Sequence, residues 1–216
     1  MKISSFVFAV VSMSNAAFAQ GFVNLNFEST TITPVVFPGG TRYVATVPGW
    51  IWTPSGNLVN GDPNSVGFNE AALDFPAVDL QGTNSPFAPA IQGKYSVFLQ
   101  GGDLPPPYAI VASFGQTGQI PLTAQSIIYW GDALQVTFNG QMLSFTDISN
   151  ALNYTIWGAD ISAYAGQTGQ LLFTVPWEST AVLDNIQFSP TPVPEPSGLA
   201  FGGLAALLLI FRRWRI

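Results

Sequence analysis

The sequence contains no cysteine and no histidine, and only 8% of its residues are charged. Without cysteine there is no disulfide, so a hydrophobic core has to stabilise the fold alone. Without histidine the chain has no Ser-His-Asp or Cys-His catalytic group, no zinc site of the usual kind and no imidazole for acid–base catalysis. These absences leave few enzyme mechanisms open.

Basic residues are also scarce, and four of the six lie in the first two and last five residues. All twelve acidic residues lie between Glu28 and Glu195, where Arg42 and Lys94 are the only basic ones, so this segment has a net charge of −10. Such a surface repels polyanions, which excludes nucleic acid as a partner. Because 48% of the residues are hydrophobic and 13% aromatic, the acidic chain is expected to fold rather than to remain disordered.

Residues 1–20 have the pattern of a secretory signal peptide. Lys2 precedes an apolar run from Phe6 to Val11, and Ala17-Phe18-Ala19 gives the small-x-small pattern for cleavage before Gln20. We therefore expect an N-terminal signal helix, cleavage after Ala19 with Ala17 and Ala19 as the small residues of the cleavage site, and export through the secretion machinery.

The chain ends in three successive elements. Residues 190–197 form a proline-rich linker, which is extended because proline fixes φ and lacks an amide donor. Residues 198–216 are predicted to form a short transmembrane helix, with Arg212, Arg213 and Arg215 stopping it in the cytoplasm. Its fourteen uncharged residues, Gly198 to Phe211, are fewer than the ~20 needed to span a bilayer.

The order Pro194-Glu195-Pro196, apolar helix, arginine cluster resembles the PEP-CTERM sorting signal of bacterial exported proteins. The resemblance covers only the tail. It implies that an exosortase, a membrane protease-transpeptidase, recognises Pro194, Glu195 and Pro196 and processes the tail, and that the protein belongs to the cell surface or an exopolysaccharide matrix. The alternative is a plain single-span, membrane-anchored structural protein.

Residues 21–189 are expected to form one all-β domain. Asn139-Gly140 lies between two alternating segments and predicts a tight hairpin, because this dipeptide tolerates positive φ at both turn positions. The region from Thr53 to Ala90 is rich in Pro, Gly, Asn and Asp and predicts long loops, with one short element at Ala71 to Phe75. The predicted strands lie at 22–27, 41–47, 94–99, 108–114, 126–130, 134–138, 141–145, 153–157, 170–175 and 181–188. Many short strands without helical periodicity indicate a two-sheet antiparallel β-sandwich, interpreted as a jelly roll.

One pentapeptide occurs twice, as Gly115-Gln-Thr-Gly-Gln119 and as Gly166-Gln-Thr-Gly-Gln170. We interpret the two copies as equivalent turns that each lead into a strand, with a duplicated binding loop as the alternative.

The body also resembles galactose-binding-like, carbohydrate-binding jelly rolls. The resemblance rests on Asn24-Leu-Asn-Phe-Glu28 and Pro48-Gly-Trp50 near its start, and on Leu183-Asp-Asn-Ile186 near its end. It implies that Glu28 and Asp184 help to hold a structural calcium ion. Oxygen ligands suit calcium. The alternative is that Asp184-Asn185 forms a capped turn and that Glu28 is solvent-exposed.

Glycan binding would use exposed aromatic rings as platforms, and Trp50, Trp52 and Trp177 are the candidates. Core packing competes with this role for each tryptophan. Trp177, between Pro176 and Glu178, is the residue most expected to be exposed. Together the patterns predict an exported, non-enzymatic protein that binds extracellular polysaccharide. The alternative is an exported hydrolase that uses paired carboxylates, for which the sequence pairs no two acidic residues.

Overall fold

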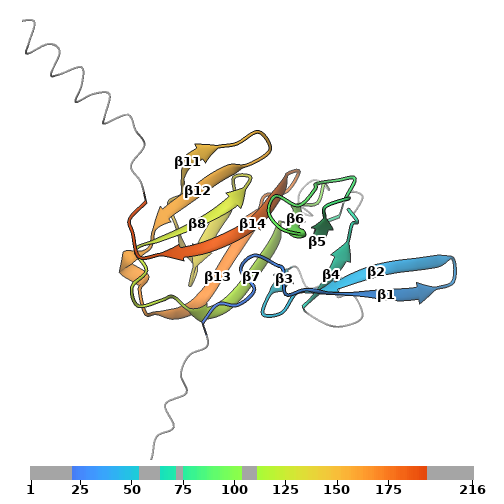
Figure 1. The fold of residues 1–216 in the computed structure, drawn as a ribbon. Coiled ribbons are helices and arrows are strands. Elements are labelled where there is room, and N and C mark those ends of the chain that lie inside the picture. Colours follow the sequence, from blue (N-terminus) through green and yellow to red (C-terminus); the bar gives the residue numbers. More distant parts are fainter. Residues whose placement is uncertain (1–20, 54–63, 72–74, 104–110, 194–216) are drawn as a thin grey trace, which may run out of the picture.

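The computed structural model describes residues 21–53, 64–71, 75–103 and 111–193, and within them the chain is all-β (Figure 1). A nine-stranded sheet has the order β1-β2-β4-β5-β6-β14-β8-β12-β11, and a five-stranded sheet the order β10-β9-β13-β7-β3. All pairs are antiparallel except β4 with β5. The strands of the first sheet are β1 Thr31–Phe37, β2 Gly40–Thr46, β4 Ser65–Phe68, β5 Ala77–Gly82, β6 Tyr95–Gln100, β8 Ser126–Gly131, β11 Thr146–Asn150, β12 Thr155–Asp160 and β14 Thr180–Ser189. Those of the second are β3 Ile51–Thr53, β7 Ala112–Gln119, β9 Gln135–Phe138, β10 Gln141–Met142 and β13 Thr168–Val175.

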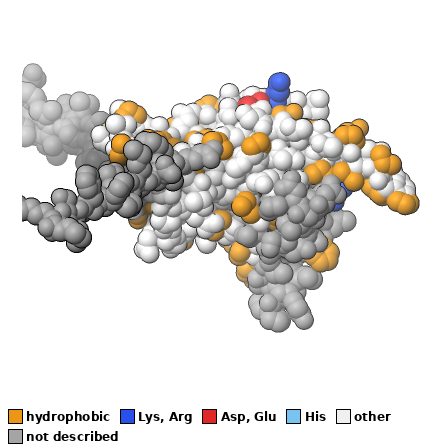
Figure 2. All heavy atoms as spheres, turned by 90° about the horizontal axis from the view of Figure 1, so that it is seen from below, with side chains coloured by type: hydrophobic (Ala, Val, Ile, Leu, Met, Phe, Trp, Pro, Cys, Tyr) orange, Lys and Arg blue, Asp and Glu red, His pale blue; other side chains and the backbone are white. Residues whose placement is uncertain are grey.

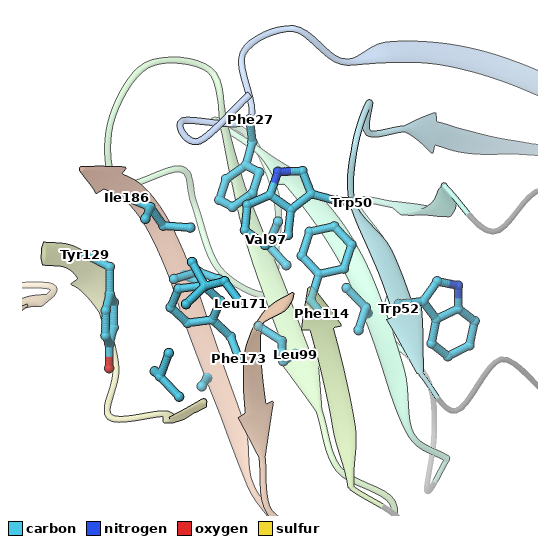
Figure 3. Close-up of a cluster of buried hydrophobic side chains, with 14 of the residues drawn as sticks. Phe27, Trp50, Trp52, Val97, Leu99, Phe114, Tyr129, Leu171, Phe173 and Ile186 are labelled. Carbon is cyan, nitrogen blue, oxygen red and sulfur yellow. The ribbon is translucent and has the colours of Figure 1, made fainter. Parts of the chain in front are cut away.

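The two sheets enclose one aromatic-rich core, as a β-sandwich requires. Trp50 is fully buried and its ring lies 4.9 Å from that of Phe114, nearly parallel to it (Figure 3). Phe173 of β13 contacts Tyr129 of β8 edge-on across the two sheets, with ring centroids 5.6 Å apart. With no cysteine, these rings and the aliphatic side chains around them provide the stabilisation.

The predicted hairpin at Asn139-Gly140 is confirmed. Asn139 and Gly140 have φ values of 49° and 76°, and β9 pairs with β10 directly across them. The second strand is short, because the pairing ends at Met142.

The strand predicted at 22–27 is wrong. Asn24 and Phe27 have positive φ values of 50° and 60°, so the segment coils into turns. It is held to β7 through a side chain: the Gln116 amide accepts a hydrogen bond from the Val23 N–H at 2.6 Å and donates one to the Val23 carbonyl at 2.9 Å. The side chain of Gln116 thus takes the place of a neighbouring strand for Val23. The alternation of apolar residues at 22–27 does not reveal this contact.

The region from Thr53 to Ala90 contains two strands where loops were predicted. Both β4 and β5 are short, and their inward-facing residues, including Val66, Val78 and Leu80, are buried. The element predicted at Ala71 to Phe75 lies mostly outside the described residues. The sequence did not predict these strands, because β4 contains Gly67 and β5 contains Asp79, and both residue types are depleted from strands in general.

The two Gly-Gln-Thr-Gly-Gln copies are not equivalent turns. The first lies within β7, whereas the second begins at a turn, where Gly166 has φ 76°, and continues into β13. The two strands are neighbours, and the copies face each other with Gly118 opposite Gly169. Gln119 also donates a side-chain hydrogen bond to the Gly166 carbonyl at 2.9 Å. The two copies of the pentapeptide therefore pair with each other in the sheet, one in β7 and one at the start of β13.

The hairpin β1–β2, which we call the arm, projects from one end of the molecule (Figure 1). Hydrophobic side chains cover much of the projecting end on the face seen in Figure 2. Val36, Phe37 and Tyr43 of the arm are exposed. Pro34 lies in β1, which is an edge strand of the nine-stranded sheet.

Residues 1–20 and 194–216 lie outside the described residues, and so do the predicted signal helix, transmembrane helix and sorting motif. Among the residues that are described, no helix is long and apolar enough to cross a membrane.

Candidate carboxylate site at the loop before β6

Asp184 is fully buried at an irregularity in β14. The pairing of β14 with β8 shifts register between Asp184 and Gln187, and Asn185 has φ 47°. Such bulges redirect side chains. Here the Asp184 carboxylate accepts hydrogen bonds from the N–H of Gln92 at 2.8 Å and of Asn185 at 2.6 Å.

Glu28 reaches the same loop from the other end of the chain. The turn at Phe27 directs its carboxylate toward residues 93–95, where Oε1 accepts the N–H of Lys94 at 2.7 Å and of Tyr95 at 3.1 Å. Gly93 has φ 66°, and a Cβ on this residue would overlap the Glu28 carboxylate. The loop therefore requires glycine at this position.

The two carboxylates predicted to share a site are thus brought to one five-residue segment, Ile91 to Tyr95. The pKa of Asp184 is raised to about 7, mainly by burial. Hydrogen bonds from backbone N–H groups lower the pKa, and the charge of Glu28 contributes to raising it. Within the described ranges no lysine or arginine forms an ion pair with either residue.

An anionic pair without a cationic side chain fits a hard cation that takes oxygen ligands. The described residues contain no group of three or more His, Cys, Asp or Glu side chains that would form a complete metal site. Backbone carbonyls and water would have to complete the coordination of calcium, and three of the four carboxylate oxygens already accept backbone N–H groups.

A second buried carboxyl group lies on β5 and was missed in the sequence. Asp79 is 4% exposed, and its carboxyl fills the space over Gly67 of β4, where a Cβ would overlap it. Beside it, Arg42 Nε lies 2.7 Å from Glu70 Oε2, the one ion pair among the residues described. The pKa of Asp79 is raised to about 7, mainly by burial and also by the charge of Glu70, while Arg42 lowers it.

Two signals for this cluster were present in the sequence. Arg42 is one of two basic residues in the acidic body, and so required a partner. Gly67 interrupts an otherwise β-forming segment, which marks a close approach by another group. Neither signal identifies Asp79 or Glu70, because the pairing of β4 with β5 is needed to place them.

The structure corrects the glycan-platform prediction for two of the three tryptophans. Trp50, just before β3, and Trp52, within β3, both point into the core. They are 0% and 4% exposed, so neither offers a ring face to a ligand. Trp50 Nε1 donates to the Asn24 carbonyl at 3.1 Å. Trp177 is partly exposed, in the turn before β14, and remains a candidate.

No family model and no curated protein matches the sequence. One similar solved structure is the enzymatically active domain of tailspike protein 4 of bacteriophage CBA120, with a TM-score of 0.35 and 12% identity. The match covers 66% of this chain and 19% of that one, so it spans about a fifth of the length of the tailspike domain.

Proposed function

We propose that this chain is an exported, non-enzymatic protein of the cell surface or exopolysaccharide matrix. A tail of the PEP-CTERM type sorts it through an exosortase, and its β-sandwich, of jelly-roll type, binds glycan. The observation that carries the sorting proposal is the order Pro194-Glu195-Pro196, apolar run, Arg212-Arg213-x-Arg215. The signal pattern at residues 1–20 supports export.

A structural calcium ion at Glu28 and Asp184 is part of the proposal. Two carboxylates converge there from opposite ends of the chain without a described cationic side chain to neutralise them. The ion would link the segment before β1 to β14 through the loop before β6. Its role would be structural, because Asp184 is fully buried.

The absence of catalysis is supported by the position of the paired carboxyl groups. The two pairs of neighbouring carboxyl groups described above are Glu28 with Asp184 and Glu70 with Asp79. In each pair the aspartate is almost inaccessible to solvent. A glycosidase needs both of its carboxyl groups at the sugar. The competing hydrolase function would require another pair.

Mass spectrometry of the protein after export tests the sorting proposal. We expect the arginine-rich segment to be absent from the mature protein, and Pro194→Ala together with Pro196→Ala to leave it in place. An intact Arg215-Ile216 end on the exported wild-type protein would contradict exosortase processing.

A glycan array probed with the full-length chain in millimolar calcium tests the binding proposal. Binding to one or more polysaccharides is expected, without release of reducing ends. Polysaccharide cleavage that disappears on substitution of a single carboxylate would establish the hydrolase instead.

A further inference from the structure

An open pocket of about 560 Å³ lies where the arm joins the body. Ligand pockets are commonly of about 300–1,000 Å³. Its apolar wall is formed by Ile32, Tyr43, Phe68 and Tyr95. Ile32, Phe68 and Tyr95 pack partly against the core, and the rings of Phe68 and Tyr95 meet edge-on with centroids 6.0 Å apart.

Tyr43 is the exposed member of this wall, with 49% of its surface accessible. It lies opposite Pro34 in the arm, and alternate residues of a strand share a face, so Tyr43 and Ile32 point the same way. Phe37 is five positions from Ile32 and points to the opposite face of the arm, where it is also 49% exposed. Tyr43 and Phe37 are therefore equally exposed rings of one hairpin, but only Tyr43 lines the pocket.

The polar rim of the pocket is held in place by the neighbouring strand. Asn69 Oδ1 accepts the Gly82 N–H at 2.7 Å, and the Glu70 carbonyl accepts the Gln81 side-chain amide at 2.7 Å. The Arg42–Glu70 ion pair lies toward the other face of the sheet, because Arg42 and Tyr43 are successive residues of β2. Within the described residues, the Asn69 amide nitrogen has no hydrogen-bond partner. This group is free to receive a ligand.

An aromatic wall with an adjacent side-chain amide suits a sugar. A pyranose ring presents C–H groups on its face, which pack on an aromatic ring, and hydroxyls at its edge, which pair with planar polar side chains. The charged residues of the lining, Arg42 and Glu70, form an ion pair, so the pocket has no net positive charge. An anionic sugar therefore gains no electrostatic attraction there, which favours neutral sugars.

We propose that this pocket binds a hexopyranose unit of a neutral oligosaccharide, with Tyr43 against the ring face and Asn69 on its hydroxyls. The inference rests on the proposed glycan binding and assigns its site. It places that site at the root of the arm, whereas the sequence pointed to the tryptophans.

The test uses the full-length chain and titrations with neutral gluco-, manno-, galacto- and xylo-oligosaccharides, with oligogalacturonate as the anionic comparison. Tyr43→Ala is expected to weaken binding of the preferred neutral sugar about tenfold or more, as for the loss of a central aromatic anchor. Phe37→Ala, the matched control on the other face, should change the affinity less than twofold. Asn69→Ala tests the amide contact. Melting temperatures identify any variant that is simply unfolded.

The outcomes are distinguishable. Failure of every sugar to bind would reject both the glycan function and this site. Binding that Tyr43→Ala and Phe37→Ala affect equally would leave the function standing and reject the site. Preferential binding of oligogalacturonate, or a Tyr43-dependent dimer in analytical ultracentrifugation without sugar binding, would also overturn the proposal.

Discussion

Asp184 and Asp79 are two buried carboxyl groups with the same elevated pKa, about 7, in different surroundings. Asp184 accepts backbone N–H groups and so joins a loop to β14. Asp79 lies over Gly67 beside an ion pair, and no hydrogen bond from the described residues reaches its carboxyl. Burial is the largest cause in both cases. Similar pKa values therefore conceal different structural roles, one as a connector and one as a buried group beside a charged pair.

The two aspartates should differ most in how much stability is lost when each is replaced by alanine. Asp184→Ala removes the acceptor of the N–H groups of Gln92 and Asn185, at a cost of about 0.5–1.5 kcal/mol for each lost hydrogen bond. Asp79→Ala removes a buried acid that accepts no described hydrogen bond, and should cost less. Urea denaturation of the two variants measures this difference. Equal losses, or a larger loss for Asp79→Ala, would contradict the roles assigned here.

The pH dependence of stability should show both groups at once. Each folded-state pKa is raised to about 7 from about 3.8, so the folded state binds more protons than the unfolded state between these values. Stability is therefore predicted to fall as pH rises from about 4 to 7 in the absence of calcium, by an amount on the order of 2 kcal/mol or more. Denaturation at pH 5 and pH 8 in EDTA measures this. Asp79→Asn should remove about half of the dependence.

Calcium should stabilise the protein through Asp184 but not through Asp79. A cation bound at Glu28 and Asp184 favours their charged forms, so it should raise the melting temperature at pH 8 by several degrees, equivalent to about 1–2 kcal/mol. Asp79→Asn should keep this response, and Asp184→Asn and Glu28→Gln should lose it. An unchanged melting temperature on addition of calcium to wild-type protein would remove the proposed metal.

The smallest effect is expected at the surface. Arg42 and Glu70 are 41% and 32% exposed at their side chains, so Arg42→Met should change the free energy of unfolding by less than about 1 kcal/mol. It should also raise the pKa of Asp79, because Arg42 lowers it. Thermal melts at pH 5 and pH 8 test both effects together. A large loss of stability at both pH values would show that the ion pair has a structural role.

Much of the fold follows from local sequence pattern. The hairpin at Asn139-Gly140 and the strands β2, β6, β8, β13 and β14 correspond to predicted strands, because alternation and turn chemistry both act within a few residues. The errors have non-local causes. A side chain of β7 holds residues 22–27, and β4 is a strand because β2 and β5 flank it.

The same distinction applies to the candidate site. A resemblance brought Glu28 and Asp184 together, and the structure places both at one loop. Trp50 and Trp52 were misjudged, because composition does not say which aromatic residues face inward. The pocket at the root of the arm was not predictable, since Tyr43 and Tyr95 lie fifty-two residues apart and meet only through the order β2-β4-β5-β6.

Pro34 gives the arm a further property, which concerns how copies of the protein meet. The two-residue turn makes Phe37 and Gly40 the closing hydrogen-bonded pair, so by alternation the backbone nitrogen of Pro34 faces away from β2. At that point the free edge of β1 has no N–H donor to offer to another strand. Long, flat and apolar edges invite strand-to-strand addition, and proline on the edge opposes it. Pro34 thus opposes fibril-like assembly through the free edge of the exposed, apolar arm.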